Sequence, residues 1–276
     1  MNPRSLKKKI IYFWKTDNEK ISIVRDILVA LILVLILLTA LWTYTGQWFG
    51  APMVAIESGS MEHLDSPFGK LGTIDAGDMV LLVKVNGKDD IVTNGGTCGG
   101  ASYNKDKDYY FYGNYGDVIV YQKYGNPNEK QIIHRAMCWV EMNSDGTYTV
   151  PEYCIVDEES ITIKSLGIND YKPSHSGFIT KGDNPVTNTQ ADQVGGICSE
   201  PIKPEWITGK ARSEIPWIGT INLLFDDIIT GKLFTPQATI YNVSEDCIFM
   251  LIIVIAILIS IPVSLDIYDW YKSKNK

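Results

Sequence analysis

The residues of this chain best suited to chemistry are a pair of serines, three histidines and two aspartates. Ser58 and Ser60 flank Gly59 in a short turn that follows an apolar, strand-like run. A serine hydroxyl becomes a nucleophile when a base takes its proton and a third group orients that base. The histidines are the candidates for the base, because imidazole exchanges protons near neutral pH.

One histidine stands apart from the other two. His134 interrupts an apolar segment, QIIHRAM, and is followed directly by Arg135. His63 comes three residues after Ser60, too close in sequence for useful geometry, and His175 lies in a polar segment. We expect His63 to be a surface residue and His175 to be a loop residue. His134 is the candidate base, although a buried histidine satisfied by a hydrogen bond would give the same pattern.

Two aspartates are candidates for orienting the base. Asp183 lies in TKGDNP and Asp192 lies in TQADQ. An aspartate after glycine is ordinarily a turn former, so the residue types suggest a triad without showing that it assembles. No CxxC motif or His/Cys spacing indicates a metal site, and we expect no cofactor.

Two uncharged stretches are long enough to cross a bilayer. They cover residues 27–45 and 247–265. At ~1.5 Å rise per residue each helix would span about 28 Å, close to a hydrocarbon core of roughly 30 Å. The first exceeds the apolar part of a cleaved signal peptide, which is about 7–15 residues long. We therefore expect two transmembrane helices.

Charge is unevenly distributed along the chain. Residues 1–26 carry seven basic and three acidic residues (net +4), and residues 266–276 carry three and two (net +1). Because the whole chain has a net charge of −7, the part between the tails carries −12. The positive-inside rule places both tails in the cytoplasm and residues 46–246 outside. This acidity argues against nucleic acid as a partner, whereas the two apolar stretches make the lipid bilayer an expected one.

The outer segment is expected to form a mainly β domain. Runs of β-branched and aromatic residues alternate with turn signals, and a weak helical pattern occurs near residues 219–233. The expected strands are residues 53–57, 78–85, 117–124, 131–142, 148–156 and 177–183. Two polar stretches, 86–115 and 157–176, are predicted to be inserted surface loops or small appendages. Four outer cysteines allow three disulfide pairings, between which the sequence does not choose. They are Cys98, Cys138, Cys154 and Cys198.

Several sequence blocks, in this order, resemble those of the type I signal peptidases. The blocks are SGSM (58–61), AGDMVLL (76–82), YGDVIVY (115–121), IIHR (132–135), FITKGDN (178–184) and ITGKARSEIPWIGTI (207–221). They follow the first apolar stretch and cover most of residues 53–221. Bacterial members typically have lysine at the position of His134. Histidine there resembles the Ser-His-Asp subtype of archaea and of the endoplasmic-reticulum complex.

The resemblance implies a membrane-bound serine endopeptidase with a signal-peptidase-like β fold between two transmembrane helices. Ser60 would be the nucleophile, His134 the general base and Asp192 the orienting carboxylate, with Asp183 as a supporting or substitute carboxylate. The Ser58 hydroxyl and the Ser60 N–H would form the oxyanion hole. The substrates would be secretory precursors, cut after small-x-small motifs.

The substrate and the lipid surface set further expectations. An extended precursor would add as a strand beside Val54, Ala55, Ile56 and Glu57. Apolar residues in 215–225 could rest on the lipid interface or equally belong to the core. The two-helix chain fits an archaeal cell membrane, with any other subunits undetermined.

Two departures from the family pattern accompany the resemblance. His63 occupies a position that is usually proline, and Asp192 follows Asp183 by nine residues where six are usual. Two other classes of protein therefore stay open. One is an inactive peptidase-like membrane protein that binds partners or organises a surface, and the other is a self-processing serine protease. Cleavage of a precursor in trans distinguishes them from a signal peptidase.

Overall fold

The computed structural model describes residues 11–274 apart from residues 17, 49, 51, 64–71 and 96–108. Residues 1–10 of the basic tail, the middle of the predicted loop 86–115, Cys98 and the last two residues of the chain lie outside the described residues. The chain divides into two units, Met1–Pro52 and Met53–Lys276.

The first unit contains the long apolar helix α2 (Glu19–Thr45). The Asn18 side chain caps the helix by accepting hydrogen bonds from the backbone N–H groups of Lys20 and Ile21, and Gly46 follows its last residue as the C-cap. α2 begins before the predicted span at residue 27, because the capped polar first turns continue into the apolar stretch. By length and composition α2 could cross a membrane.

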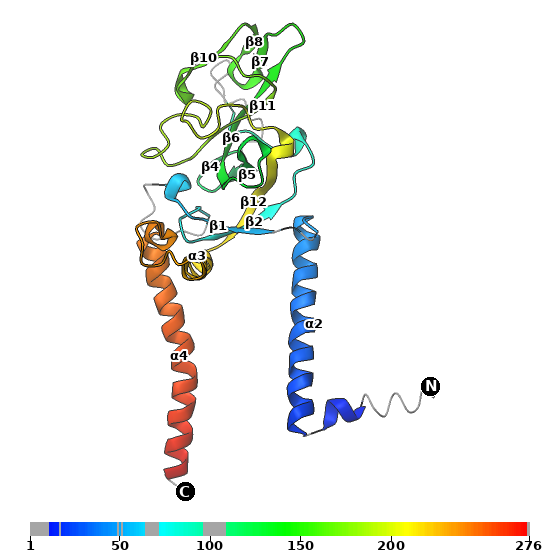
Figure 1. Ribbon diagram of the computed structural model, residues 1–276, viewed down its shortest axis with the longest axis vertical. Helices are drawn as coiled ribbons and strands as arrows, with labels where there is room; N and C mark the ends of the chain where they lie inside the picture. The colour runs from blue at the N-terminus through cyan, green and yellow to red at the C-terminus, as the bar shows by residue number, and fades with distance from the viewer. Residues whose placement is uncertain are drawn as a thin grey trace, which may run out of the picture. The chain divides into compact units, whose positions relative to one another are not determined.

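The second unit is mainly β and ends in a second long apolar helix (Figure 1). Its strands are β1 (Met53–Ala55), β2 (Met79–Val83), β3 (Tyr110–Phe111), β4 (Asn114–Tyr115), β5 (Val118–Gln122), β6 (Gln131–Met142), β7 (Tyr148–Val150), β8 (Ile155–Glu158), β9 (Ile161–Ile163), β10 (Ile168–Tyr171), β11 (Gly177–Lys181) and β12 (Ile207–Ile215). Its α-helices are α3 (Ile218–Ile229) and α4 (Glu245–Lys274). Short 3₁₀ helices are η1 (Gly59–Met61), η2 (Lys88–Asp90), η4 (Lys123–Gly125), η5 (Pro151–Tyr153), η6 (Lys164–Leu166), η7 (Pro204–Trp206) and η8 (Thr239–Asn242). α4 also has the length and composition to cross a membrane.

The strands form one main antiparallel sheet in the order β1-β2-β12-β5-β6-β7-β8, and β11 also pairs with β6. β6 is long enough to serve both parts of this sheet: residues 131–135 pair with β5, and residues 135–140 pair with β11. The register between β11 and β6 shifts after Ile179, which is typical of a bulge and bends the strand. β6 therefore joins the two parts of the sheet, and it carries both His134 and Arg135.

Separate apolar clusters lie at the two ends of the sheet. One lies between β1, β2, β5 and β12 and includes Ile56, Met61, Val80 and Leu82. The other lies under β7, β9 and β10 and includes Cys138, Val150, Ile161 and Ile168. The stretch 157–176, predicted to be a loop or appendage, thus folds as the end of β8 followed by β9 and β10. Its isoleucines pack into the core, although its charged residues dominate the sequence pattern.

The mainly β class and the two flanking apolar helices agree with the sequence-based expectation. The expected strands do not include β12, because Gly209, Lys210 and Arg212 interrupt its apolar pattern. The cysteines differ from a two-disulfide arrangement: Cys154 is disulfide-bonded, whereas Cys138 and Cys198 are buried free thiols.

α3 is fixed to the turn that precedes β2. The Trp217 N–H donates to the Asp78 carboxylate at 3.0 Å, and the Thr220 N–H donates to the Gly77 carbonyl at 2.8 Å. A side chain at Gly219 would place its Cβ 2.1 Å from the Asp78 carbonyl oxygen, which is backbone and cannot move aside. Only glycine allows this close approach of the helix to the sheet.

Gly219→Ala should therefore destabilise the domain, because the methyl group must push α3 off the turn at Asp78. We expect a loss of roughly 1–3 kcal/mol in the free energy of unfolding, as for other overpacked sites. Denaturation of the full chain in detergent measures it. The matched control is Gly87→Ala, where the backbone is extended and no atom lies within 4 Å of the added methyl group. Equal stability of the two variants would contradict this account of α3.

Candidate active site

β6 presents His134 and Arg135 to opposite faces of the sheet, because successive side chains of a strand alternate. Both side chains are buried: His134 is 3 % exposed and Arg135 is 0 % exposed. A buried polar or charged side chain needs partners, since water no longer solvates it. Each of the two has a carboxylate as its partner, delivered by the loop that follows β11.

His134 is hydrogen-bonded to Asp192. Its Nδ1 lies 2.7 Å from Asp192 Oδ2 and 2.8 Å from Oδ1, and both side chains are buried. Two hydroxyls donate to the same carboxylate oxygen: Tyr121 from β5 at 2.8 Å and Thr180 from β11 at 2.6 Å. Asp192 is therefore held by three side chains from three strands. Its backbone N–H also donates to the Thr180 carbonyl, which fixes the loop.

The environment of Asp192 favours its ionised form. Burial acts to raise its pKa, but the pKa is lowered overall, because His134, Thr180 and Tyr121 together stabilise the carboxylate. A carboxylate accepts hydrogen bonds, so the proton of a neutral His134 belongs on Nδ1. Nε2 is then the unprotonated nitrogen that can accept a proton. Burial, then the charge of Asp192, raises the pKa of Tyr121, which keeps that hydroxyl a donor.

The turn that carries Ser60 is fixed by two asparagines from the loop after β11. The Asn184 N–H and the Asn188 side-chain amide donate to the Ser60 carbonyl oxygen at 3.0 and 3.1 Å. The Asn184 side-chain amide also donates to the Gly59 carbonyl at 2.7 Å. A Cβ on Gly182 would lie 2.6 Å from the Ser60 carbonyl oxygen, so the loop reaches this turn only with glycine there. The same loop thus positions both Asp192 and the Ser60 turn.

Ser60 and His134 line one groove, of about 680 Å³. η1 packs against β6, which brings the serine turn to the histidine strand. Ser58 lies at the start of η1, also lines the groove, and makes no capping hydrogen bond with its hydroxyl. Side chains of β6 and α3 also line this groove. So do all four predicted substrate-binding residues, Val54, Ala55, Ile56 and Glu57.

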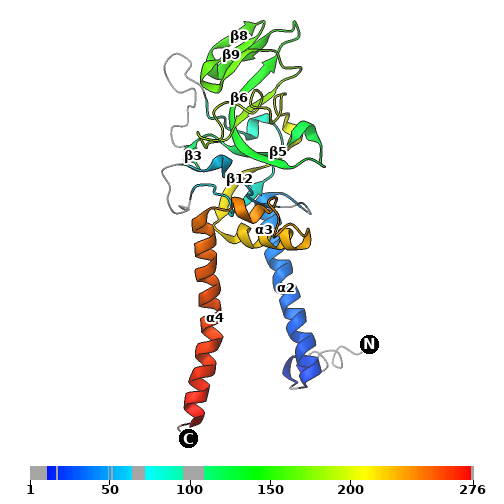
Figure 2. The ribbon, with the colours of Figure 1, turned by 60° about the vertical axis from the view of Figure 1, so that its left-hand side comes forward.

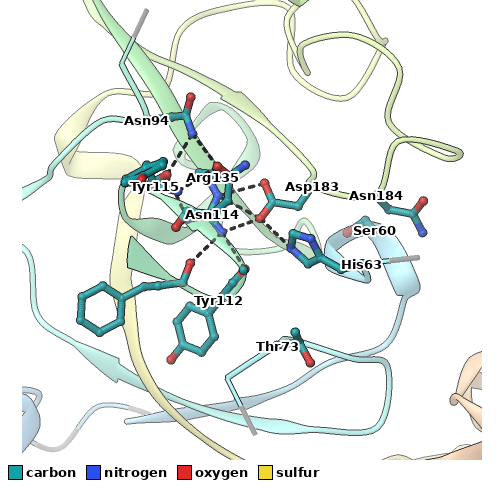
Figure 3. Close-up of polar contacts among 12 residues, drawn as sticks. Ser60, His63, Thr73, Asn94, Tyr112, Asn114, Tyr115, Arg135, Asp183 and Asn184 are labelled. Atoms are coloured by element: carbon teal, nitrogen blue, oxygen red, sulfur yellow. Dashed lines mark hydrogen bonds and ion pairs between the residues drawn. The ribbon is translucent and has the colours of Figure 1, made fainter. Parts of the chain in front are cut away.

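Asp183 is bound to Arg135 rather than to His134 (Figure 3). The Arg135 Nε donates to both carboxylate oxygens at 2.9 Å, and one terminal nitrogen also donates to Oδ2. The terminal nitrogens also donate to the backbone carbonyls of Phe111, Tyr112, Asn114, Tyr115 and Gly116. His63 Nε2 lies 3.4 Å from Asp183 Oδ2, an oxygen that Arg135 also binds. Figure 3 shows Ser60 and Asn184 beside this cluster. Asp183 therefore supports the hairpin β3–β4 and the segment after Ser60.

Sequence reasoning misplaces His63 and misses four polar groups. His63 is half-buried against Asp183 and Gly113, because the segment after Ser60 turns inward toward Arg135, whereas a surface position is expected from the sequence. The four missed groups are Tyr121, Thr180, Asn184 and Asn188. Tyr121 and Thr180 interrupt otherwise apolar strand faces, a signal similar to the one that identifies His134. His175 stacks edge-on against Trp206, away from the groove.

No protein-family model matches the chain, and no curated protein matches it significantly. Among the described residues, no group of three or more His, Cys, Asp and Glu side chains could hold a metal ion. A function for this chain is therefore inferred from the geometry of the groove and from the side chains that line it.

Asp183→Asn should strongly destabilise the protein, because it leaves the buried guanidinium of Arg135 without its counter-charge. Breaking one partner of a buried pair typically costs about 3–5 kcal/mol, and chemical denaturation in detergent measures this loss. Glu57→Gln is the matched control: it breaks an ion pair with Lys130 at 2.7 Å, but those side chains are 45 % and 78 % exposed. There we expect less than about 1 kcal/mol. Similar losses in both variants would contradict the structural role of Asp183.

Stability should also fall with rising pH through His63. The Asp183 carboxylate, 3.4 Å from Nε2, raises the pKa of His63 above 6.5, with burial acting in the opposite sense. Because the pKa is higher in the folded state, this contribution is fully present below pH 6.5 and is lost as the pH rises through the raised value. The measurement is the difference in free energy of unfolding between wild type and His63→Gln across this range. A difference that does not change with pH would refute it.

Proposed function

We propose that this protein is a membrane-bound serine endopeptidase that removes signal peptides from secretory precursors. Ser60 acts as the nucleophile, His134 as the general base and Asp192 as the residue that orients the base. The observation that carries the proposal is the buried His134–Asp192 hydrogen bond in the wall of the groove that Ser60 also lines. A histidine bonded through Nδ1 to a carboxylate, in a groove that a serine also lines, is the arrangement that activates a serine hydroxyl.

The reaction proceeds in two steps through an acyl-enzyme. His134 Nε2 takes the Ser60 hydroxyl proton while Oγ attacks the scissile carbonyl carbon, and Asp192 stabilises the resulting imidazolium. The carbon–nitrogen bond then breaks, and the leaving amine takes that proton from His134. Water repeats the sequence on the ester and releases the signal peptide as a carboxylic acid. The Ser58 hydroxyl and the Ser60 N–H stabilise the oxyanion.

The substrate binds as an extended strand along β1. β1 is the last strand in the sheet order, so no strand among the described residues pairs with its outer edge. An added strand satisfies the free backbone groups of such an edge. Val54, Ile132 and Ile133 give the groove an apolar wall. The branched side chains of this wall leave room for small substrate residues rather than bulky ones.

The membrane topology follows from charge and from the two apolar helices. α2 and α4 cross the membrane, both tails are cytoplasmic, and the catalytic domain faces the outside, where precursors emerge. The combination of a histidine base and two membrane helices agrees best with an archaeal cell membrane. We also propose that the mainly β domain has the signal-peptidase-like fold, because the sequence blocks occur in the order that resembles this family.

Purified protein in liposomes should cleave a synthetic precursor in trans, and Ser60→Ala should reduce the rate to background. Asp192→Asn should lower kcat by about 10²–10⁴, because the imidazole loses its orientation and its charge partner. Ser174→Ala, on an exposed serine outside the groove, is the matched control and should be fully active. Gel analysis of precursor and product over time gives the rates.

The negative outcomes are equally specific. A folded wild type that leaves the precursor intact would favour a binding protein with this architecture, and cleavage of its own chain alone would favour a self-processing protease. Full activity of Asp192→Asn would remove the histidine–aspartate pair from the mechanism.

A further inference from the structure

α3 carries an apolar face that nothing in the described part of the chain covers. Its members recur at spacings of three and four residues, which places them on one side of the helix. They are Ile218, Ile221, Phe225, Ile228 and Ile229, exposed by 36 % to 82 %. The opposite side packs on the domain with Gly219, Thr220, Leu223 and Asp227. A soluble domain would place polar residues on the outward side of such a helix.

The helix cannot rotate to bury this face. At its start, Trp217 and Thr220 are bonded to the turn before β2. Near its end, the buried Asp227 carboxylate accepts hydrogen bonds from the backbone N–H groups of Thr239 and Ile240, at 3.0 and 2.9 Å. The apolar side chains therefore point outward in a rigid arrangement. Phe234, just beyond the helix, is 92 % exposed and extends the apolar character of this region.

α4 identifies what covers the face. Its first turn is anchored to the same part of the domain, because the Ser244 hydroxyl donates to the Ala76 carbonyl at 2.9 Å. Cys247, in that turn, packs with Leu223 of α3 and with Val243. Figure 2 shows α3 running across the direction of α4 at its N-terminal end. If α4 crosses the bilayer, α3 lies at the depth where α4 enters it, parallel to the surface.

We infer that α3 is an interfacial membrane helix, with the apolar face around Phe225 in the boundary between headgroups and acyl chains. Interfacial helices of this kind insert about 5–10 Å. The charged residues of α3 are Asp226 and Asp227, so attraction to anionic lipid contributes nothing. Apolar burial alone drives this contact, and zwitterionic lipid suffices for it.

The same helix forms part of the proposed active-site groove. Asn222 and Asp226, on a flank of the exposed face, line the groove together with Leu223. At most one helix thickness, about 10–12 Å with side chains, then separates the lipid from the groove. This part of the inference rests on the proposed function. α3 holds the groove beside the bilayer surface, where the cleavage site of a membrane-embedded precursor emerges and can enter it.

The contact is tested with a fluorescent label in liposomes of phosphatidylcholine. The full chain carries Phe225→Cys modified with an environment-sensitive NBD group, and Val156→Cys on β8, where the native side chain is 62 % exposed, is the matched control. Unsubstituted protein corrects for labelling of its buried free cysteines. We expect spin-labelled phosphatidylcholine to quench the label at residue 225 and aqueous iodide to quench the label at residue 156.

Two results overturn the inference. Iodide quenching at residue 225 equal to that at residue 156 means that the face lies in water. Protection of residue 225 from both quenchers means that another protein surface, such as a second copy of the chain, covers it. Neither result depends on catalysis, because the Ser60→Ala protein gives the same readout.

Activity gives a second, separable test. Phe225→Asp should lower cleavage of a bilayer-embedded precursor by about tenfold or more, because the helix loses its apolar contact with lipid. Cleavage of a short soluble peptide should stay within about twofold, because Phe225 does not line the groove. Equal losses on both substrates contradict the role of α3 in substrate access, and an unchanged thermal transition verifies the fold. If wild type cleaves neither substrate, the proposed function fails while the quenching result stands.

Discussion

The site depends on the cost of burying polar groups on both faces of one strand. β6 places His134 on one face and Arg135 on the other, and neither can be solvated by water there. Each needs a carboxylate of its own, and the loop after β11 delivers both, Asp192 to the histidine and Asp183 to the arginine. If either aspartate lay on the opposite face of β6, its basic partner would be buried without a counter-charge, and both carboxylates would share one face. The loop after β11 must therefore follow a path that delivers one aspartate to each face.

The loop between the two aspartates has a second function that the same path makes possible. Asn184 and Asn188 donate hydrogen bonds to the carbonyl of Ser60, so one segment positions both the Ser60 turn and Asp192, the carboxylate partner of His134. A shift of this segment would move Ser60 and Asp192 together. Their relative geometry is therefore less sensitive to motion of the rest of the domain.

Sequence patterns are informative where the physical signal is local. The apolar runs predict the strands around His134 and both long helices, because side-chain period and stretch length are read within one segment. The partners of Asp192 are long-range: Tyr121 lies 71 residues away, and strand period indicates its face without indicating which carboxylate shares that face. The expected surface position of His63 is wrong for the same reason, since its partner Asp183 is delivered by a distant loop. The stretch 157–176 resembles a loop because its buried isoleucines are outnumbered by charged residues.

α3 shows why exposure has to be combined with rigidity before it indicates a partner. A flexible segment with apolar residues can fold back on the domain, and its exposure then carries little meaning. In α3, Gly219 meets the backbone of Asp78, and the Asp227 carboxylate bonds Thr239 and Ile240 of η8, so the outward side chains have no alternative place to pack. An apolar face held outward in water carries a continuing cost in free energy. That cost disappears when the surface beside α4 is lipid, which makes membrane insertion and the orientation of the groove two consequences of one packing arrangement.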